Sequence, residues 1–315
     1  MQRFTDTDGS AVYLKAIIFL LAANIVAGIV AASAKEASGY DLLADSMFNY
    51  AVMTVFQALN GATVYYHIFK SRRRPGIFFS RVRPETPFIG IAAALLCLFG
   101  FYGTAFAFQR LLDVTGYVGQ TGISLDSAGD IVFGVLVTVV FAPLCEELVY
   151  RGALLSGLRR RFSAPAAVLL SGLAFSFMHM SPQQTVYQFF LGCSCAALAL
   201  SARSVWPAVA AHAASNLTAV VMDVTPLGGA FEEFVGGLCA GAATLFTILS
   251  AAAAAAAITG LTVVLKKRAL PAERCEPQEE KEGALGKHTA VILYLFALGI
   301  TLAMWTATLV QGYNG

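Results

Sequence analysis

Apolar stretches recur along this chain, and many are long enough to cross a membrane as a helix. A transmembrane helix needs about 20 consecutive, mostly apolar residues, and only helices and closed barrels satisfy their backbone polar groups inside a bilayer. Charged residues make up 13% of the chain, whereas about 25% is typical of soluble domains. We therefore expect an all-α, polytopic membrane protein with about nine transmembrane helices. The expected spans are 11–33, 49–69, 89–110, 130–157, 165–180, 183–202, 204–222, 235–265 and 289–310.

Lysine and arginine gather in alternate connecting segments of this expected bundle. Basic clusters lie at 70–88, 159–161, Arg203 and 266–288, while the segments between them are acidic or neutral. Cytoplasmic segments of membrane proteins carry the excess of Lys and Arg, so nine alternating spans put every basic cluster on one side. We therefore expect a multi-pass protein of the cell membrane with a cytoplasmic N-terminus. The net charge of +2 gives no reason to expect a nucleic-acid partner.

Two adjacent carboxylates and a guanidinium lie inside the fourth expected span. Glu147 and Arg151 are four residues apart with the acid first, which is the favourable order for an ion pair on one helix face. Glu146 lies about 100° around the helix from Glu147, so it faces elsewhere. Charged residues inside membranes usually pair with one another or mark functional sites. We expect Glu147 and Arg151 to form a structural ion pair and Glu146 to have a function.

Three more polar residues fall inside later spans. His179 lies near the end of the fifth, and His212 and Asn216 share one face of the seventh because they are four residues apart. A single His or Asn in a span usually makes an interhelical hydrogen bond, worth about 0.6 kcal/mol on average, which is the alternative for each residue alone. Burying all these groups separately, with Glu146 unpaired, is costly. The whole set therefore favours one site where the side chains converge around water.

The residue types in this set suit one kind of chemistry. An intramembrane carboxylate such as Glu146 can act as a general base, and a His beside it can share the water that it activates. A second His and an Asn can donate to a developing oxyanion. The result is hydrolysis of an acyl bond without a Ser or Cys nucleophile. Zinc is the alternative, since Glu and two His can bind it, but the chain has no His-Glu-x-x-His run and we expect no metal or other cofactor.

Three short motifs resemble those of the CPBP family of intramembrane proteases, which includes CAAX prenyl endopeptidases and bacteriocin-processing or immunity proteins. Glu-Glu-x-x-x-Arg stands at 146–151, Phe-x-x-x-His at 175–179 and His-x-x-x-Asn at 212–216. Each motif alone is weak, whereas all three in order on separate spans are specific. The resemblance covers about 130–222 and not the first three spans or the segment after 222.

The resemblance implies a role for each matched residue. Glu146 would activate water together with His179, while His212 and Asn216 would stabilise the oxyanion; Phe175 belongs to the second motif. It also implies a glutamic endopeptidase that cuts a peptide or a membrane-anchored protein, with the lipid bilayer as its surroundings. The alternative class is a non-enzymatic membrane protein with a bacteriocin-immunity or proton-coupled transport role, because buried Glu and His also suit a proton relay.

The resemblance also divides the chain into three regions. We expect an N-terminal three-helix membrane region at 1–129 and a catalytic helical core at 130–222. A C-terminal two-helix membrane region follows at 223–315, and it contains a cytoplasmic linker at 266–288. The linker has mixed charge and no apolar period, which is typical of segments that stay disordered.

Overall fold

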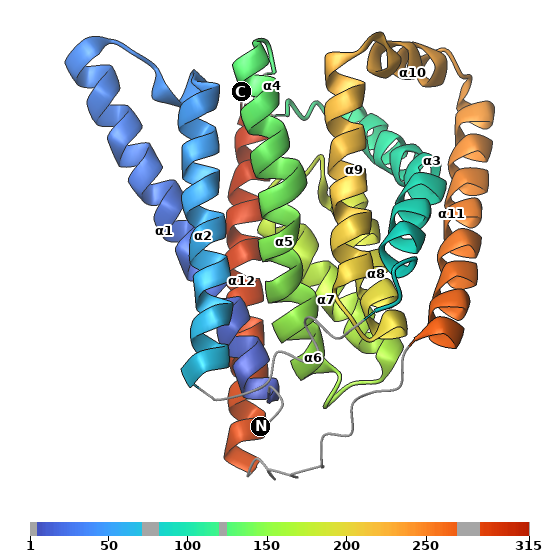
Figure 1. Cartoon of the computed structure of the whole chain (residues 1–315). Helices are drawn as coiled ribbons and strands as arrows, with labels where there is room; N and C mark the ends of the chain where they lie inside the picture. The colour runs from blue at the N-terminus through green and yellow to red at the C-terminus, as the bar shows by residue number, and fades with distance from the viewer. Residues whose placement is uncertain (1–4, 71–81, 120–124, 270–283, 315) are drawn as a thin grey trace.

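The computed structural model describes residues 5–70, 82–119, 125–269 and 284–314, which form helices and no strand (Figure 1). The expected all-α fold is confirmed for this part of the chain. The first elements are α1 (Asp6–Ser38), the short η1 (Leu42–Ala44), α2 (Ser46–Lys70) and α3 (Thr86–Val114). Then comes one continuous rod of α4 (Ala128–Gly134), η3 (Val135–Phe141), α5 (Ala142–Glu147), η4 (Leu148–Leu154) and α6 (Leu155–Leu158). The last elements are α7 (Ala164–Met178), α8 (Thr185–Ala202), α9 (Trp206–Val224), α10 (Pro226–Gly236), α11 (Ala240–Arg268) and α12 (Ala284–Asn314).

Each expected span overlaps a helix or the continuous rod, but not all of these helices are long and apolar enough to cross a membrane. Among the described residues, five helices are long and apolar enough by length and composition, and α3 adds a sixth as two segments bent by 41°. Helix α7 is too short at 15 residues, and polar residues such as Gln57 in α2 and His212 in α9 interrupt the apolar runs. The protein is therefore a polytopic all-α membrane protein, and the count of nine stays a prediction.

Local sequence signals fix where several helices begin and end. Thr5 and Asp8 form a reciprocal capping box at the start of α1, and Ser127 and Asp130 form another at the start of the rod. Each box satisfies backbone N–H groups that the first helical turn leaves without partners. Helix α1 ends at Gly39, whose φ of 74° is readily adopted only by glycine.

The eighth expected span, 235–265, is placed wrongly at its start. The structure has α10 at Pro226–Gly236 and begins the long helix α11 only at Ala240. We expected the segment before 235, which contains Asp223, Glu232 and Glu233, to be an acidic loop between spans. Instead, the Thr225 hydroxyl accepts a hydrogen bond from Leu227 N, and Pro226 occupies the first turn, where a missing N–H costs nothing. Of the expected linker 266–288, residues 270–283 lie outside the described part of the chain.

Two ion pairs join segments from the basic end of the bundle. Arg161, after the rod, lies 3.2 Å from Asp6 at the start of α1, and Arg268 at the end of α11 lies 3.2 Å from Glu85 beside α3. Figure 1 shows the N-terminus at this end and the C-terminus at the other. The basic segments that the structure describes therefore lie together, as alternating spans require.

The central rod differs from a regular helix on both sides of its charged residues. The segments η3 and η4 are π-helical, and α5 between them carries Glu146 and Glu147. Single π-helical turns within α-helices occur frequently at functional sites. Around the rod, α2 packs on α5 and α9 packs on α5 and η3, while α7 packs on η4 and α8. These helices bring residues from distant parts of the chain to the middle of the bundle.

Candidate active site

A buried ion pair anchors the rod at its charged segment. Arg151 Nη1 lies 3.0 Å from Glu147 Oε1, and both side chains are fully buried. Arg151 Nη2 also donates to the Gly192 carbonyl at 3.0 Å, and the guanidinium carbon lies 4.4 Å from the centre of the Phe175 ring. The pair that the four-residue spacing predicts is thus present. It ties the rod to α7 and α8 as well as closing one helical turn.

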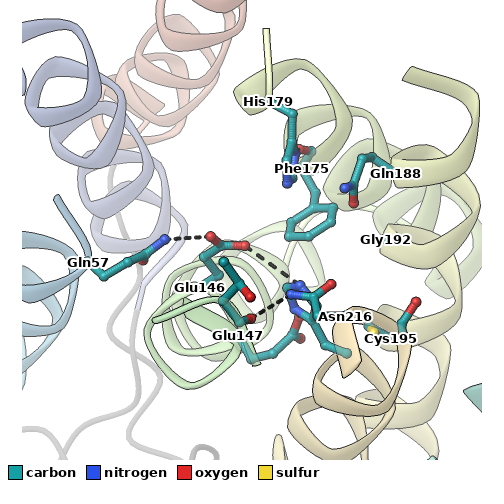
Figure 2. Close-up of polar contacts among 12 residues, drawn as sticks. Gln57, Glu146, Glu147, Phe175, His179, Gln188, Gly192, Cys195 and Asn216 are labelled. Carbon is teal, nitrogen blue, oxygen red and sulfur yellow. Dashed lines mark hydrogen bonds and ion pairs between the residues drawn. The ribbon is translucent and has the colours of Figure 1, made fainter. Parts of the chain in front are cut away.

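Glu146 faces a different direction from Glu147, and its two carboxylate oxygens have different surroundings (Figure 2). Oε1 accepts a hydrogen bond of 2.6 Å from Gln57 Nε2 on α2. Oε2 is buried and has no hydrogen-bond partner within the described part of the chain. It lies 3.9 Å from His212 Nε2, which is too far for a direct hydrogen bond. The site therefore presents one occupied and one unoccupied oxygen of the same acid.

His212 lies between the two glutamates. Its Nδ1 is 3.0 Å from Glu147 Oε1, and its ring packs edge-to-face on Phe175 with the centroids 5.4 Å apart. Because a carboxylate only accepts, Nδ1 of His212 carries the hydrogen of this bond. The other nitrogen, Nε2, faces Glu146. Glu147 thus orients His212 as well as pairing with Arg151, which the sequence reasoning did not anticipate.

Phe175 and His179 line another part of the site. His179 Nδ1 lies 2.9 Å from the Phe175 carbonyl, which only accepts, so Nδ1 donates and Nε2 is left as an acceptor. The Phe175 ring contacts both imidazoles, since its centroid is 5.0 Å from that of His179. His179 is partly exposed, whereas Glu146 and His212 are buried. No hydrogen bond or ion pair joins His179 to Glu146 in the described structure.

Asn216 makes a contact that the sequence did not reveal. Its Nδ2 donates to the Thr138 carbonyl in η3 at 2.7 Å, so α9 is fastened to the rod one turn away from His212. The amide nitrogen has two hydrogens, and this bond uses one of them. The convergence expected at the sequence level is therefore partial. Glu146 lies close to His212, but the carboxamide that contacts it comes from Gln57 and not from Asn216.

Gln57 and Asn60 are the residues that sequence reasoning missed. Both are buried on α2, and Asn60 Nδ2 lies 3.4 Å from Gln57 Oε1. The available signal was their spacing of three residues inside an apolar run, which places both side chains on one helix face. As for metal, no three His, Cys, Asp or Glu side chains in the described ranges lie close enough together to hold an ion.

The sequence of residues 128–218 matches the family described as Rce1-like, type II CAAX prenyl endopeptidase. The chain is therefore similar to CAAX endopeptidases over this segment. The comparison with curated proteins found no match, and neither did the comparison with solved structures. The matched CAAX protease segment contains the rod, α7, α8 and most of α9, and with them all seven residues of the three motifs. Gln57 and Asn60 lie outside it.

Proposed function

We propose that this protein is an intramembrane glutamic endopeptidase in which Glu146 activates water for attack on a peptide bond. The observation that carries the proposal is the gap of 3.9 Å between Glu146 Oε2 and His212 Nε2. A polar separation of this size is one that a single water bridges. Both atoms accept hydrogen bonds, and a water has two hydrogens to donate. Its lone pairs are then directed away from both groups and toward a bound carbonyl carbon.

The reaction balances with these groups alone. As the water oxygen bonds to the carbonyl carbon, Glu146 Oε2 takes one of its protons and the carbonyl oxygen becomes an oxyanion. Collapse of this tetrahedral intermediate breaks the carbon–nitrogen bond. The proton held by Glu146 then passes to the leaving amine, which restores the carboxylate. General-base assistance of this kind is worth about 10²- to 10⁴-fold in rate.

Asn216 and the two histidines complete the proposed site. Asn216 has a second amide hydrogen, and we assign it to the oxyanion. The family resemblance gives the water to His179 and the oxyanion to His212, but the geometry favours His212 for the water because it is the imidazole that faces Glu146 Oε2. Catalytic contacts often tighten only when substrate binds. A role for His179 in holding the water is therefore tested together with that of His212.

The proposed substrate is a peptide or a membrane-anchored protein that reaches the site from within or beside the bilayer. The partly exposed His179 marks the accessible side of the site, since Glu146 and His212 are covered. We also propose that the basic end of the bundle faces the cytoplasm, because cytoplasmic segments carry the excess of Lys and Arg.

The decisive experiment measures cleavage by the purified protein in lipid vesicles. The substrates are a quenched fluorescent peptide ending in a prenylated CAAX sequence and the same peptide without the prenyl group. Glu146→Gln removes the base at nearly constant size, and we expect cleavage to fall by at least about 100-fold. Glu232→Gln, at an exposed carboxylate of α10, is the matched control. Wild-type cleavage by Glu146→Gln would refute the mechanism, and inhibition by chelators would indicate a metal enzyme.

A further inference from the structure

A directional chain of hydrogen bonds leads from α2 to the proposed base. Asn60 Nδ2 lies 3.4 Å from Gln57 Oε1. Gln57 Nε2 in turn donates to Glu146 Oε1 at 2.6 Å (Figure 2). The orientation of the Gln57 amide follows from its partners, because a carboxylate accepts only and must face the NH₂ group. Its oxygen then faces Asn60. All three residues are buried, with at most 5% of each residue's surface exposed.

This arrangement makes the two oxygens of Glu146 inequivalent. Gln57 occupies Oε1, and the carboxylate plane is held so that Oε2 faces His212. Without the Gln57 bond, the Glu146 side chain is free to turn about its terminal torsion, which is broad for a carboxylate. Oε2 would then spend less time beside the bridging water. A charge-assisted hydrogen bond is among the stronger contacts that can fix such an orientation.

The chain of bonds is also incomplete at its outer end. Asn60 Oδ1 is buried and has no hydrogen-bond partner within the described residues, which costs free energy. Helix α2 also contacts α5 apart from this polar pair. Gly61, which is four residues after Gln57, lies beside Cys145 of α5, and a Cβ at this position would be 3.4 Å from Cys145 Sγ, an ordinary van der Waals contact. Packing of α2 on the rod therefore includes contacts that do not depend on Gln57.

We propose that Gln57 is a positioning residue for the hydrolysis, holding Glu146 by one oxygen so that the other meets the attacking water. The proposal rests on the proposed function, since it assumes that Glu146 is the base. It extends the site beyond the segment that matches the CAAX endopeptidase family, because α2 precedes that segment. The N-terminal membrane region would then supply part of the active site.

The test uses two substitutions at position 57 in the full-length protein in vesicles. Gln57→Leu removes the donor at similar size, and Gln57→Met removes it while keeping an unbranched side chain of similar length. We expect kcat to fall by roughly 10- to 100-fold in both, because a hydrogen bond to a charged group is lost, while KM changes by less than about twofold. Thr63→Val is the control, since the buried Thr63 hydroxyl donates to the Leu59 carbonyl of its own helix and has no other hydrogen bond to a residue that the structure describes.

The outcomes separate positioning from a structural role. Thermal unfolding gives the folded fraction of each variant, and kcat is expressed per folded molecule. A lower kcat with KM and unfolding temperature retained supports the proposal. An unchanged kcat in both variants overturns it, whether or not the unfolding temperature falls. Glu146→Gln is assayed in parallel: if it is active, the proposed function fails, whereas if it is inactive and Gln57→Leu is fully active, only the role of Gln57 fails.

Discussion

Oε2 of Glu146 and Nε2 of His212 lie 3.9 Å apart, a separation that no direct hydrogen bond spans and one water does. The two residues come from different helices, α5 and α9, and each is held by a second contact. Gln57 holds Glu146, and Glu147 holds His212. Both atoms at the gap are therefore presented by side chains whose other polar atom is already occupied. Such preorganisation is what a site that activates water requires.

The first prediction distinguishes the two imidazoles. We expect His212→Ala to lower kcat by about 10²- to 10⁴-fold, because it removes the group that shares the water with Glu146. His179→Ala is expected to have a smaller effect, since no described contact links it to Glu146. Steady-state cleavage of the prenylated peptide measures both variants, with KM determined separately. A larger loss for His179→Ala would instead support the roles that the family resemblance implies.

The second prediction concerns the buried pair of Glu147 and Arg151. Arg151→Met leaves an uncompensated carboxylate in the bundle, and we expect a loss of about 3–5 kcal/mol of stability. The double variant Glu147→Gln, Arg151→Met removes both charges and should recover part of that loss. Thermal unfolding of the wild type and both variants in the same detergent measures their order of stability. If the double variant is less stable than Arg151→Met, the uncompensated Glu147 carboxylate is not what destabilises the single variant.

The sequence predicted contacts within one helix better than contacts between helices. The Glu147–Arg151 pair depends only on a spacing of four residues, which helical geometry fixes before any packing occurs. The hydrogen bond from Gln57 to Glu146 joins residues 89 positions apart, and no spacing rule reports which face of α2 meets α5. That contact becomes visible only when the helices pack.

Two further features had weak or no sequence signals. Asn216 donates to the backbone carbonyl of Thr138. Because every residue has a backbone carbonyl, the sequence does not indicate which one Asn216 contacts. The sequences of the π-helical segments η3 and η4 show no pattern that distinguishes them from α-helix. The all-α fold, by contrast, follows from the need to satisfy backbone groups in lipid.

The third prediction tests whether Asn216 acts in catalysis or only fastens α9 to the rod. If its second amide hydrogen stabilises the oxyanion, Asn216→Ala lowers kcat by about 10²- to 10³-fold, the usual effect of losing one such donor. If it only bonds to the Thr138 carbonyl, the unfolding temperature falls and kcat per folded molecule is retained. Measuring both quantities on the same preparation decides between these roles. Thr218→Val, two residues further along α9, is the control because its hydroxyl bonds within the helix to the Ala214 carbonyl.

The last prediction concerns the orientation of the bundle. Cys239 is exposed just before α11, at the end opposite the ion pairs of Arg161 and Arg268. Cys275 belongs to the expected cytoplasmic linker and lies outside the described residues. In intact cells, a membrane-impermeant maleimide should label a variant whose single cysteine is Cys239. A variant with Cys275 alone should be labelled only after the membrane is permeabilised. The reverse pattern would place the basic end outside the cell, against the excess of Lys and Arg that cytoplasmic segments carry.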